Sequence, residues 1–187
     1  VAAMVRLLGL EMVYVCASGH LGGSFSAMDI LTVLYFEVMN VDPKNPADPD
    51  RDRFVLSKGH CTPALYPILA QKGYFPEEDL ALFRSVEGHL SGHAEMNHVK
   101  GVDMSTGSLG QGISAAVGMA LAGKMDKKAY RVYTVLGDGE VEDRLGKLSS
   151  AQPNTDWTTS ARPLMSMVCR LMERQQMLCP QSRWIRS

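Results

Sequence analysis

The sequence predicts an α/β domain built on a parallel sheet. Residues 53–60 read as a short strand that ends in a polar turn, and residues 130–139 read as a second, largely apolar strand. Segments with helical spacing lie before, between and beside them. Strands that alternate with helices are typical of a parallel sheet, and a largely apolar strand fits a sheet that is covered on both faces.

The composition is that of an ordinary globular protein. The chain has 187 residues, 45% apolar and 21% charged, which is enough for one domain with a core. The net charge of −1 gives no electrostatic reason to expect a nucleic acid or a membrane as partner. The four cysteines, Cys16, Cys61, Cys169 and Cys179, lack paired spacing, which favours reduced thiols and a cytoplasmic location.

Two helices are predicted in the first 40 residues. The apolar positions that recur at helical spacing in residues 1–17 are Ala2, Val5, Leu8, Met12 and Val15. Because Arg6 and Glu11 interrupt this run, it does not read as a membrane span. Three glycines predict a turn over residues 18–24, and residues 26–40 predict a second apolar helix.

The elements between the two strands follow from prolines, acids and glycines. Residues 41–53 are rich in proline and aspartate and predict a surface loop. Residues 61–75 predict a helix with Pro63 in its first turn, and residues 76–85 a short helix that opens with a proline and acids. A loop over residues 87–107 then precedes a closely packed, glycine- and alanine-rich helix over residues 108–125.

Two glycine-containing segments are candidate ligand sites. Asp138 stands between Gly137 and Gly139 at the carboxyl end of the second strand, where open α/β sheets bind ligands. Its carboxylate suits Mg²⁺, although an ordinary Asp-Gly turn explains the pattern equally well. The glycines of residues 105–112 would let backbone N–H groups approach a ligand, and close helix packing is the competing explanation.

Three histidines share one local context. His20, His60 and His93 each follow a glycine at the end of an element. We interpret them as imidazoles gathered to contact phosphate or sugar hydroxyls, or to move protons. His89 and His98 are interpreted as surface residues, although His89 also follows a glycine.

Six motifs occur in order over residues 1–142: "SGHLGGS", "DRFVLSKGH", "GYFPEEDL", "GHAEM", "MSTGSLGQG" and "YRVYTVLGDGE". Together they resemble the N-terminal, thiamine diphosphate-binding part of transketolase, above all the form made as two chains. The resemblance implies a three-layer, parallel-sheet thiamine diphosphate-binding fold over residues 1–142, incomplete at its C-terminal side. Residues 143–187 do not match it and are expected to be an aberrant, poorly ordered tail.

The resemblance also implies which residues bind the cofactor. Asp138 would bind the Mg²⁺ (or Ca²⁺) ion that holds thiamine diphosphate, with Gly139 beside the phosphate. His60 would contact the diphosphate. The loop residues that would pack on the cofactor are Gly107, Ser108 and Leu109.

His20 and His93 match the family's catalytic histidines, which lie near the reacting carbon and the sugar hydroxyls. Leu21 departs from the pattern, because the family usually has a proline after the first histidine. A proline would stiffen that turn, and the leucine does not.

The implied activity is transfer of a two-carbon ketol unit between sugar phosphates. It implies a C-terminal transketolase subunit or domain as partner, because the glutamate that activates the cofactor lies there, and a homo- or hetero-oligomer. A 1-deoxyxylulose-5-phosphate synthase-like enzyme is the alternative, although "SKGH" and "MSTGSLGQG" favour transketolase. A catalytically silent truncated product is a further alternative.

Residues 143–187 depart from the family abruptly, and they lack the asparagine expected as second Mg²⁺ ligand. Joining the third base of each codon to the next two bases permits Trp-Glu-Ala over residues 145–148 and Leu-Asp-Asn-Leu-Cys over residues 156–161. Residues 163–172 permit Asp-Val-Asn-Gly, with the glycine forced by a methionine codon. These are the words that the family predicts, so we interpret the tail as frame-shifted from about Asp143. Its scattered arginines support an RNA-binding tail poorly.

Overall fold

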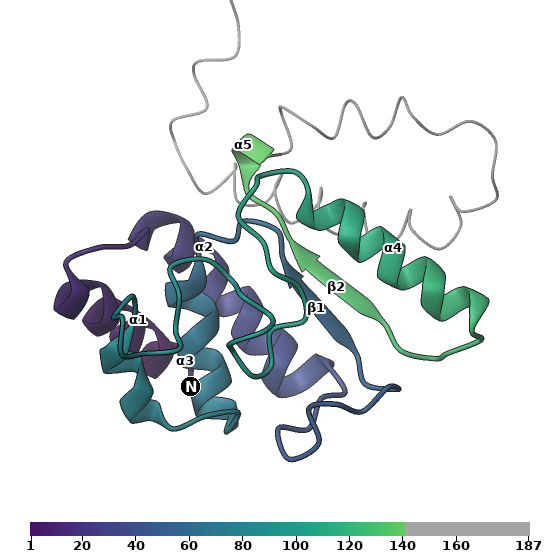
Figure 1. The fold of residues 1–187 in the computed structure, drawn as a ribbon, viewed down its shortest axis with the longest axis horizontal. Helices are drawn as coiled ribbons and strands as arrows, with labels where there is room; N and C mark the ends of the chain where they lie inside the picture. Colours follow the sequence, from purple (N-terminus) through teal and green to yellow (C-terminus); the bar gives the residue numbers. More distant parts are fainter. Residues whose placement is uncertain (141–187) are drawn as a thin grey trace, which may run out of the picture. The chain divides into compact units, whose positions relative to one another are not determined.

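The structure, a computed structural model, describes residues 1–140 (Figure 1). Residues 1–137 form one compact unit and a second begins at Asp138, so each is described by itself. The principal elements of the first unit are α1 (Ala2–Cys16), α2 (Leu21–Val33), β1 (Arg53–Leu56), α3 (Thr62–Lys72), α4 (Gly112–Met125) and β2 (Val132–Val135). The frame-shifted tail predicted from about Asp143 lies outside the described residues.

β1 and β2 pair as parallel neighbours, as the sequence predicts. Phe54 lies opposite Tyr133, and Val55 lies opposite Thr134. The Thr134 hydroxyl also donates a hydrogen bond of 3.0 Å to the Val55 carbonyl. Because side chains alternate along a strand, each pair of opposite residues faces one side of the sheet.

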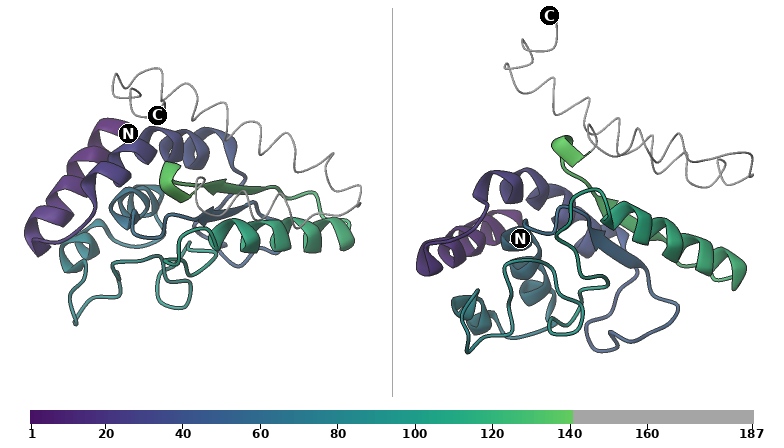
Figure 2. Two further views of the ribbon diagram at one scale, coloured as in Figure 1. Left: turned by 90° about the horizontal axis from the view of Figure 1, so that it is seen from above. Right: turned by 45° about the horizontal axis from the view of Figure 1, so that its top comes forward.

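On one side of the sheet, α1, α2 and α3 pack on one another (Figures 1 and 2). Phe54, Leu56 and Tyr133 join the apolar core that these helices form. The largest fully buried aliphatic side chains of the three helices are Val5, Met28, Leu31, Leu65, Ile68 and Leu69. This layer supplies most of the apolar surface removed from water in the described part of the chain.

α4 covers the opposite face, which makes the unit a helix–sheet–helix arrangement of three layers (Figure 2). Val55 and Val132 pack against Ala116 in a second, smaller apolar cluster. A Cβ on Gly112 would lie 2.6 Å from the Ser57 Cα, and one on Gly123 would lie 2.7 Å from the Tyr130 ring. The glycines of α4 therefore allow the close packing that the sequence predicts.

The starts of two helices differ from the prediction. α2 begins at Leu21, so Gly22 and Gly23 lie inside the helix and the predicted turn over residues 18–24 is shorter. The Ser24 hydroxyl and its backbone N–H both donate to the His20 carbonyl, which stabilises the early start. Conversely, α4 begins at Gly112 and not at residue 108.

α2 continues into a short π-helix, η1 (Leu34–Val38). The combined segment Leu21–Val38 is long and apolar enough, by length and composition, to cross a membrane. Core helices satisfy the same criterion, and Ala27, Met28 and Leu31 on this segment are buried in the core with residues of α3. We therefore interpret the segment as a core helix.

The helices between the strands have the predicted order. α3 has Pro63 in its first turn and ends at Gly73, whose φ of 98° is left-handed and suits glycine. The predicted short helix over residues 76–85 is a 3₁₀ helix, η2 (Glu77–Leu82), which follows Pro76. The loop predicted over residues 87–107 contains no helix or strand.

Aspartates fasten the loop over residues 41–52 to the sheet. Asp52 accepts hydrogen bonds from the backbone N–H groups of Asn40 (2.9 Å) and Arg131 (2.7 Å). Asp103 pairs with Arg51 at 2.5 Å and accepts the N–H of Phe54 at 2.7 Å. Burial alone would lower the pKa of Arg51, but its hydrogen bond to Asp103 and the charge of that carboxylate raise it above its ordinary value.

Candidate functional site

The turn that follows β1 forms the floor of the candidate site. Ser57, Lys58 and Gly59 are buried, and His60 is half-buried. The Gly59 N–H donates to the Ser57 carbonyl at 3.0 Å, and the Cys61 N–H donates to the Lys58 carbonyl at 2.9 Å. This compact turn holds His60 at the carboxyl end of a parallel strand, where α/β folds bind ligands.

His20 lies beside His60. Their ring centroids are 4.9 Å apart, with the rings edge-on at 72°. His20 is the residue that precedes α2, and it reaches His60 because the first turn of α2 packs on the turn after β1. The Lys58 ammonium donates to the Gly23 carbonyl at 2.7 Å and to the Ser26 hydroxyl at 3.0 Å, which ties these two segments together.

The loop before α4 packs directly on the turn after β1. A Cβ on Gly59 would lie 2.5 Å from the Thr106 carbonyl carbon and 2.7 Å from the Gly107 nitrogen, so only glycine fits at position 59. The Thr106 hydroxyl donates to the Leu56 carbonyl at 2.7 Å. Gly107, Ser108 and Leu109 are therefore brought next to the turn that carries His60.

His93 completes the group. The Ala94 N–H donates to the Gly59 carbonyl at 3.2 Å, and the Thr106 N–H donates to the Ala94 carbonyl at 3.0 Å. A Cβ on Gly107 would lie 3.1 Å from Cδ2 of His93, which places the imidazole against that loop. The three Gly-His segments predicted from the sequence thus meet around one loop.

Two hydroxyl groups hold the backbone at His93 in place. The His93 carbonyl accepts hydrogen bonds from the Tyr66 hydroxyl (3.0 Å) and from the Ser91 hydroxyl (2.7 Å). On the next turn, Glu95 accepts a hydrogen bond from the Ser105 hydroxyl at 2.8 Å. The Asn97 backbone N–H and the Ser105 hydroxyl lower the pKa of Glu95 below its ordinary value.

The residues of this group suit thiamine diphosphate. His20, His93, Ser108 and Leu109 are exposed, and His60 and Gly107 are half-buried, so a ligand can reach all of them. Imidazoles can donate hydrogen bonds to phosphate oxygens and sugar hydroxyls. The close packing at Gly59 holds the loop at Gly107 against the turn that carries His60. The candidate site therefore has both the donors and the access that the cofactor requires.

Asp138 and Gly139 belong to the second unit. They lie in α5 (Asp138–Glu140), which begins three residues after Val135 at the end of β2, and both are exposed. Within the described residues no group of three or more His, Cys, Asp or Glu side chains forms a metal site. The Mg²⁺ site at Asp138 stays a prediction, and the family's second ligand position falls outside the described residues.

Four residues near the site were not predicted from the sequence: Ser18, Lys58, Tyr66 and Arg84. Each acts through a contact between distant segments, which leaves no local pattern in the sequence. The prediction for His89 as a surface residue is only partly right, because its ring is half-buried, 3.9 Å from Asp79 and edge-on to Phe75. His98 is exposed, as predicted.

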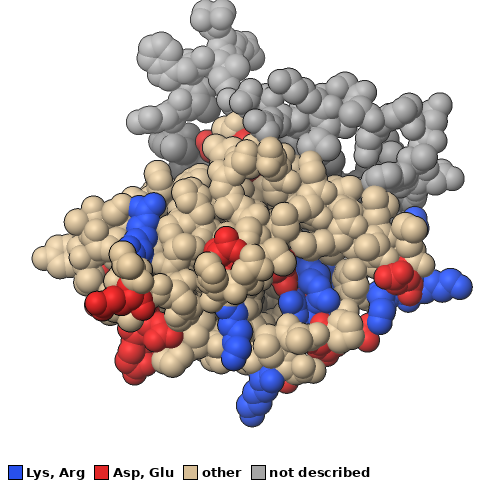
Figure 3. Space-filling view, in the orientation of Figure 1, with Lys and Arg blue, Asp and Glu red and all other residues tan. Residues whose placement is uncertain are grey.

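Charges are mixed on the face of the described residues in Figure 3, where acidic and basic side chains lie among one another. Within the described residues, neither Cys16 nor Cys61 takes part in a disulfide.

The fold is a three-layer α/β domain, and its candidate site lies at the carboxyl end of a parallel strand. Residues 1–150 match the family described as "Transketolase, thiamine diphosphate binding domain". The chain belongs to the transketolase family, through its thiamine diphosphate-binding domain.

Curated relatives agree with this assignment. The chain is 51% identical over 142 residues to the 6-deoxy-6-sulfo-D-fructose transketolase subunit SqwG of Clostridium sp. (strain MSTE9), covering 76% of this chain and 52% of that protein. It is 47% identical over 131 residues to one subunit of the apulose-4-phosphate transketolase of Phocaeicola vulgatus, covering 70% and 46%. The chain thus spans about half the length of these two relatives.

Solved structures give the same fold. The transketolase of Leishmania mexicana matches with a TM-score of 0.70 at 34% identity, over 76% of this chain and 23% of that one. The transketolase of Campylobacter jejuni matches with a TM-score of 0.70 at 36% identity, over the same shares. The described unit is therefore an α/β thiamine diphosphate-binding domain that is incomplete relative to its relatives.

Proposed function

We propose that this chain derives from the cofactor-binding subunit of a transketolase that transfers a two-carbon ketol unit between sugars. The observation that supports this most is the meeting of His20, His60 and His93 around the loop at Gly107. When bound, thiamine diphosphate would supply the carbanion chemistry, and the protein would supply orientation and hydrogen bonds.

Each residue has a proposed role in that site. His60 and the backbone of Gly107, Ser108 and Leu109 hold the cofactor. His20 and His93 are the catalytic histidines, which donate hydrogen bonds to the sugar hydroxyls and move protons. Asp138 and Gly139 bind the Mg²⁺ or Ca²⁺ ion and the diphosphate; Mg²⁺ typically uses one or two carboxylates with substrate phosphates.

We also propose that the activity requires a second chain. Two relatives are named as subunits, and this chain matches about half of each. The partner would be a C-terminal transketolase subunit, in a cytoplasmic assembly of two or more chains.

The proposed substrate is a ketose that carries an anionic end group. The relatives are named for 6-deoxy-6-sulfo-D-fructose and for apulose 4-phosphate, which carry a sulfonate and a phosphate. A sugar phosphate is the first choice, and a sulfonated sugar is the second. The partner chain would complete the pocket that distinguishes them.

Reconstitution tests the proposal. The chain, with its tail restored to the family's reading frame, is mixed with a complementary transketolase subunit, thiamine diphosphate and Mg²⁺. Ketol transfer from xylulose 5-phosphate to ribose 5-phosphate, or from the sulfonated ketose, is the expected result. Turnover of pyruvate with glyceraldehyde phosphate, and not of either ketose, would contradict it. Asp138→Ala should abolish cofactor binding in isothermal titration, and equal binding would refute the metal assignment.

The frame of the tail has a separate test. The relatives that cover 76% of this chain match it over 142 or 143 residues and the family match runs over residues 1–150, so the likeness stops well before residue 187. The nucleotide sequence across codons 138–187 should contain a single-base slip near codon 143. A clean run of codons that relatives share in the same frame would refute the slip.

A further inference from the structure

Arg84 has an unusual backbone conformation. Its φ of 61° is left-handed, which is uncommon for any residue other than glycine, asparagine or aspartate. The Arg84 N–H donates to the Leu90 carbonyl at 2.8 Å, so the backbone closes the loop over residues 84–90 at this point. Strained backbone of this kind persists only where the surroundings hold it, and it often lies at functional sites.

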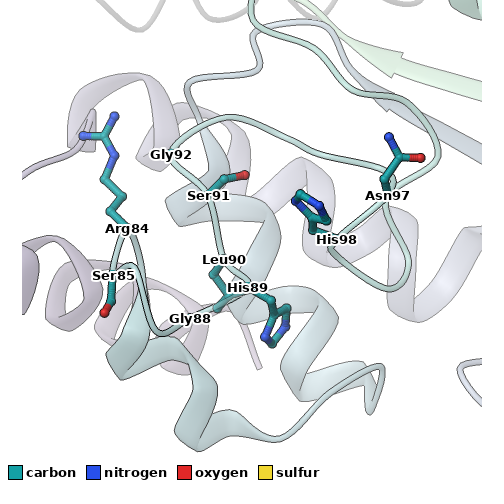
Figure 4. A pocket seen from close by; sticks show the side chains of 9 residues that line it. All are labelled: Arg84, Ser85, Gly88, His89, Leu90, Ser91, Gly92, Asn97 and His98. Atoms are coloured by element: carbon teal, nitrogen blue, oxygen red, sulfur yellow. The ribbon is translucent and has the colours of Figure 1, made fainter.

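The side chain of Arg84 connects three segments. Its Nη1 donates a hydrogen bond to the Ser18 hydroxyl. The guanidinium also lies 5.8 Å from the centre of the Phe83 ring. It lies against Gly92 so closely that a Cβ there would clash with Nε, and in Figure 4 the side chain extends toward Gly92.

Both contacted positions adjoin candidate catalytic residues. Ser18 is two residues before His20, and Gly92 is immediately before His93. Arg84 is exposed, so its planar fork is held by these contacts and not by burial. The loops that carry His20 and His93 therefore share one cation, although they are far apart in the sequence.

We propose that Arg84 is a positioning residue that sets the separation of His20 and His93 across the candidate site. It acts on both through Ser18 and Gly92 and touches neither imidazole. We call the contacts of Arg84 with Ser18 and Gly92 the bridge. The bridge rests on the geometry alone, whereas its effect on catalysis rests on the proposed function. A Cβ at position 92 would displace the Arg84 guanidinium from this contact.

Anion binding in a nearby hollow is the alternative role for the Arg84 guanidinium. Arg84, His89, Ser91, Asn97 and His98 line a hollow of about 680 Å³ (Figure 4). The guanidinium already donates to Ser18 and packs on Gly92, so we assign Arg84 to the bridge and not to ligand binding. Saturable perturbation of the His89 and His98 signals by inorganic phosphate would assign it to anion binding instead and overturn the proposal.

Histidine-selective NMR of the full chain without cofactor tests the bridge. Arg84→Met should shift the imidazole signals of His20 and His93 together. Ser18→Ala, which removes a single hydroxyl, should shift His20 in the same direction, and Arg84→Lys should restore the signals in part. Arg6→Met is the matched control, since Arg6 pairs with Asp29 at 2.5 Å between α1 and α2, away from these loops.

Signals of His20 and His93 that stay in place in both Arg84→Met and Ser18→Ala would overturn the proposal. A shift of one histidine alone in Arg84→Met would also overturn it, because a bridge must move both. If Arg84→Met does not fold, Arg84→Lys takes its place, and both signals must still move, although by less. In the reconstituted complex, Arg84→Met should lower kcat about 10- to 100-fold with little change in KM. Failure of the wild-type chain to bind thiamine diphosphate, with both signals still moving, would refute the proposed function and leave the bridge intact.

Discussion

Lys58 is a buried cation that connects two segments of the candidate site. The residue is 6% exposed, and its ammonium donates to the Gly23 carbonyl and the Ser26 hydroxyl. Burying a charge is costly unless it is hydrogen-bonded, so these two contacts offset the cost of its position. They also fix the first turn of α2, and hence His20, against His60.

We expect Lys58→Met to destabilise the chain by about 1–3 kcal/mol, because the Gly23 carbonyl loses a charged donor. Urea unfolding measures the change, and the His20 and His60 NMR signals should move with it. Lys100→Met is the control, since Lys100 is exposed. Identical unfolding midpoints for the two variants would show that the Lys58 contacts contribute nothing.

Tyr66 links stability to pH. Burial raises the pKa of Tyr66 from 10.0 to about 12, against a smaller lowering by Ser91. Folding therefore favours the neutral phenol, whose contribution is present below pH 10 and is lost as the pH rises through about 12. The full loss for this group is about 2–3 kcal/mol.

Tyr66→Phe should remove this part of the alkaline loss, and it should cost about 1 kcal/mol near neutral pH because the His93 carbonyl loses a hydrogen bond. Urea unfolding at pH 8 and pH 11 measures both effects. Tyr14→Phe is the control, because Tyr14 is 83% exposed. An alkaline slope equal to that of the wild type in Tyr66→Phe would contradict the assignment.

At the scale of elements, we expect substitution by alanine to have opposite effects on stability at Gly59 and Gly118. A Cβ on Gly59 would meet the backbone of Thr106 and Gly107, which cannot yield without moving the loop. A Cβ on Gly118, inside α4, would meet nothing within 4 Å. The contrast separates a loop contact from helix propensity.

Gly59→Ala should destabilise the chain by about 1–3 kcal/mol through overpacking. Gly118→Ala should stabilise it by about 0.5–1 kcal/mol, because alanine favours the helix. Thermal unfolding of both variants measures the two signs. Gly59→Ala with unchanged stability would show that the two loops are not in the contact described.

Most of the secondary structure could be predicted from the sequence. The two strands, their parallel pairing and the main helices were predictable, because strand and helix periods are local. The predicted start of α2 was wrong. Gly22 and Gly23 suggested a turn, whereas the hydrogen bonds of Ser24 and the packing of the helix favour an earlier start. The Gly-His pattern correctly predicted that His20, His60 and His93 lie near one another. The same pattern also fits His89, which lies instead beside Asp79 and Phe75.

At the scale of the whole molecule, the tail decides whether the site can work. We expect the 187-residue chain as written to bind thiamine diphosphate with Mg²⁺ only weakly, because residues 143–187 supply no matching second ligand for the metal. Isothermal titration compares it with the frame-restored chain, which should bind more tightly. Micromolar affinity of the chain as written would contradict this expectation.

The pairing of β1 with β2 has a consequence for the order of assembly. The hydrogen bond from Thr134 to Val55 closes a loop of 79 residues, and the entropy of that closure is lost before the strand contacts compensate for it. Helices α1 to α3 form a local core that needs no such closure. During synthesis the N-terminal layer can therefore collapse early, while the layer that α4 covers cannot form until β2 has left the ribosome.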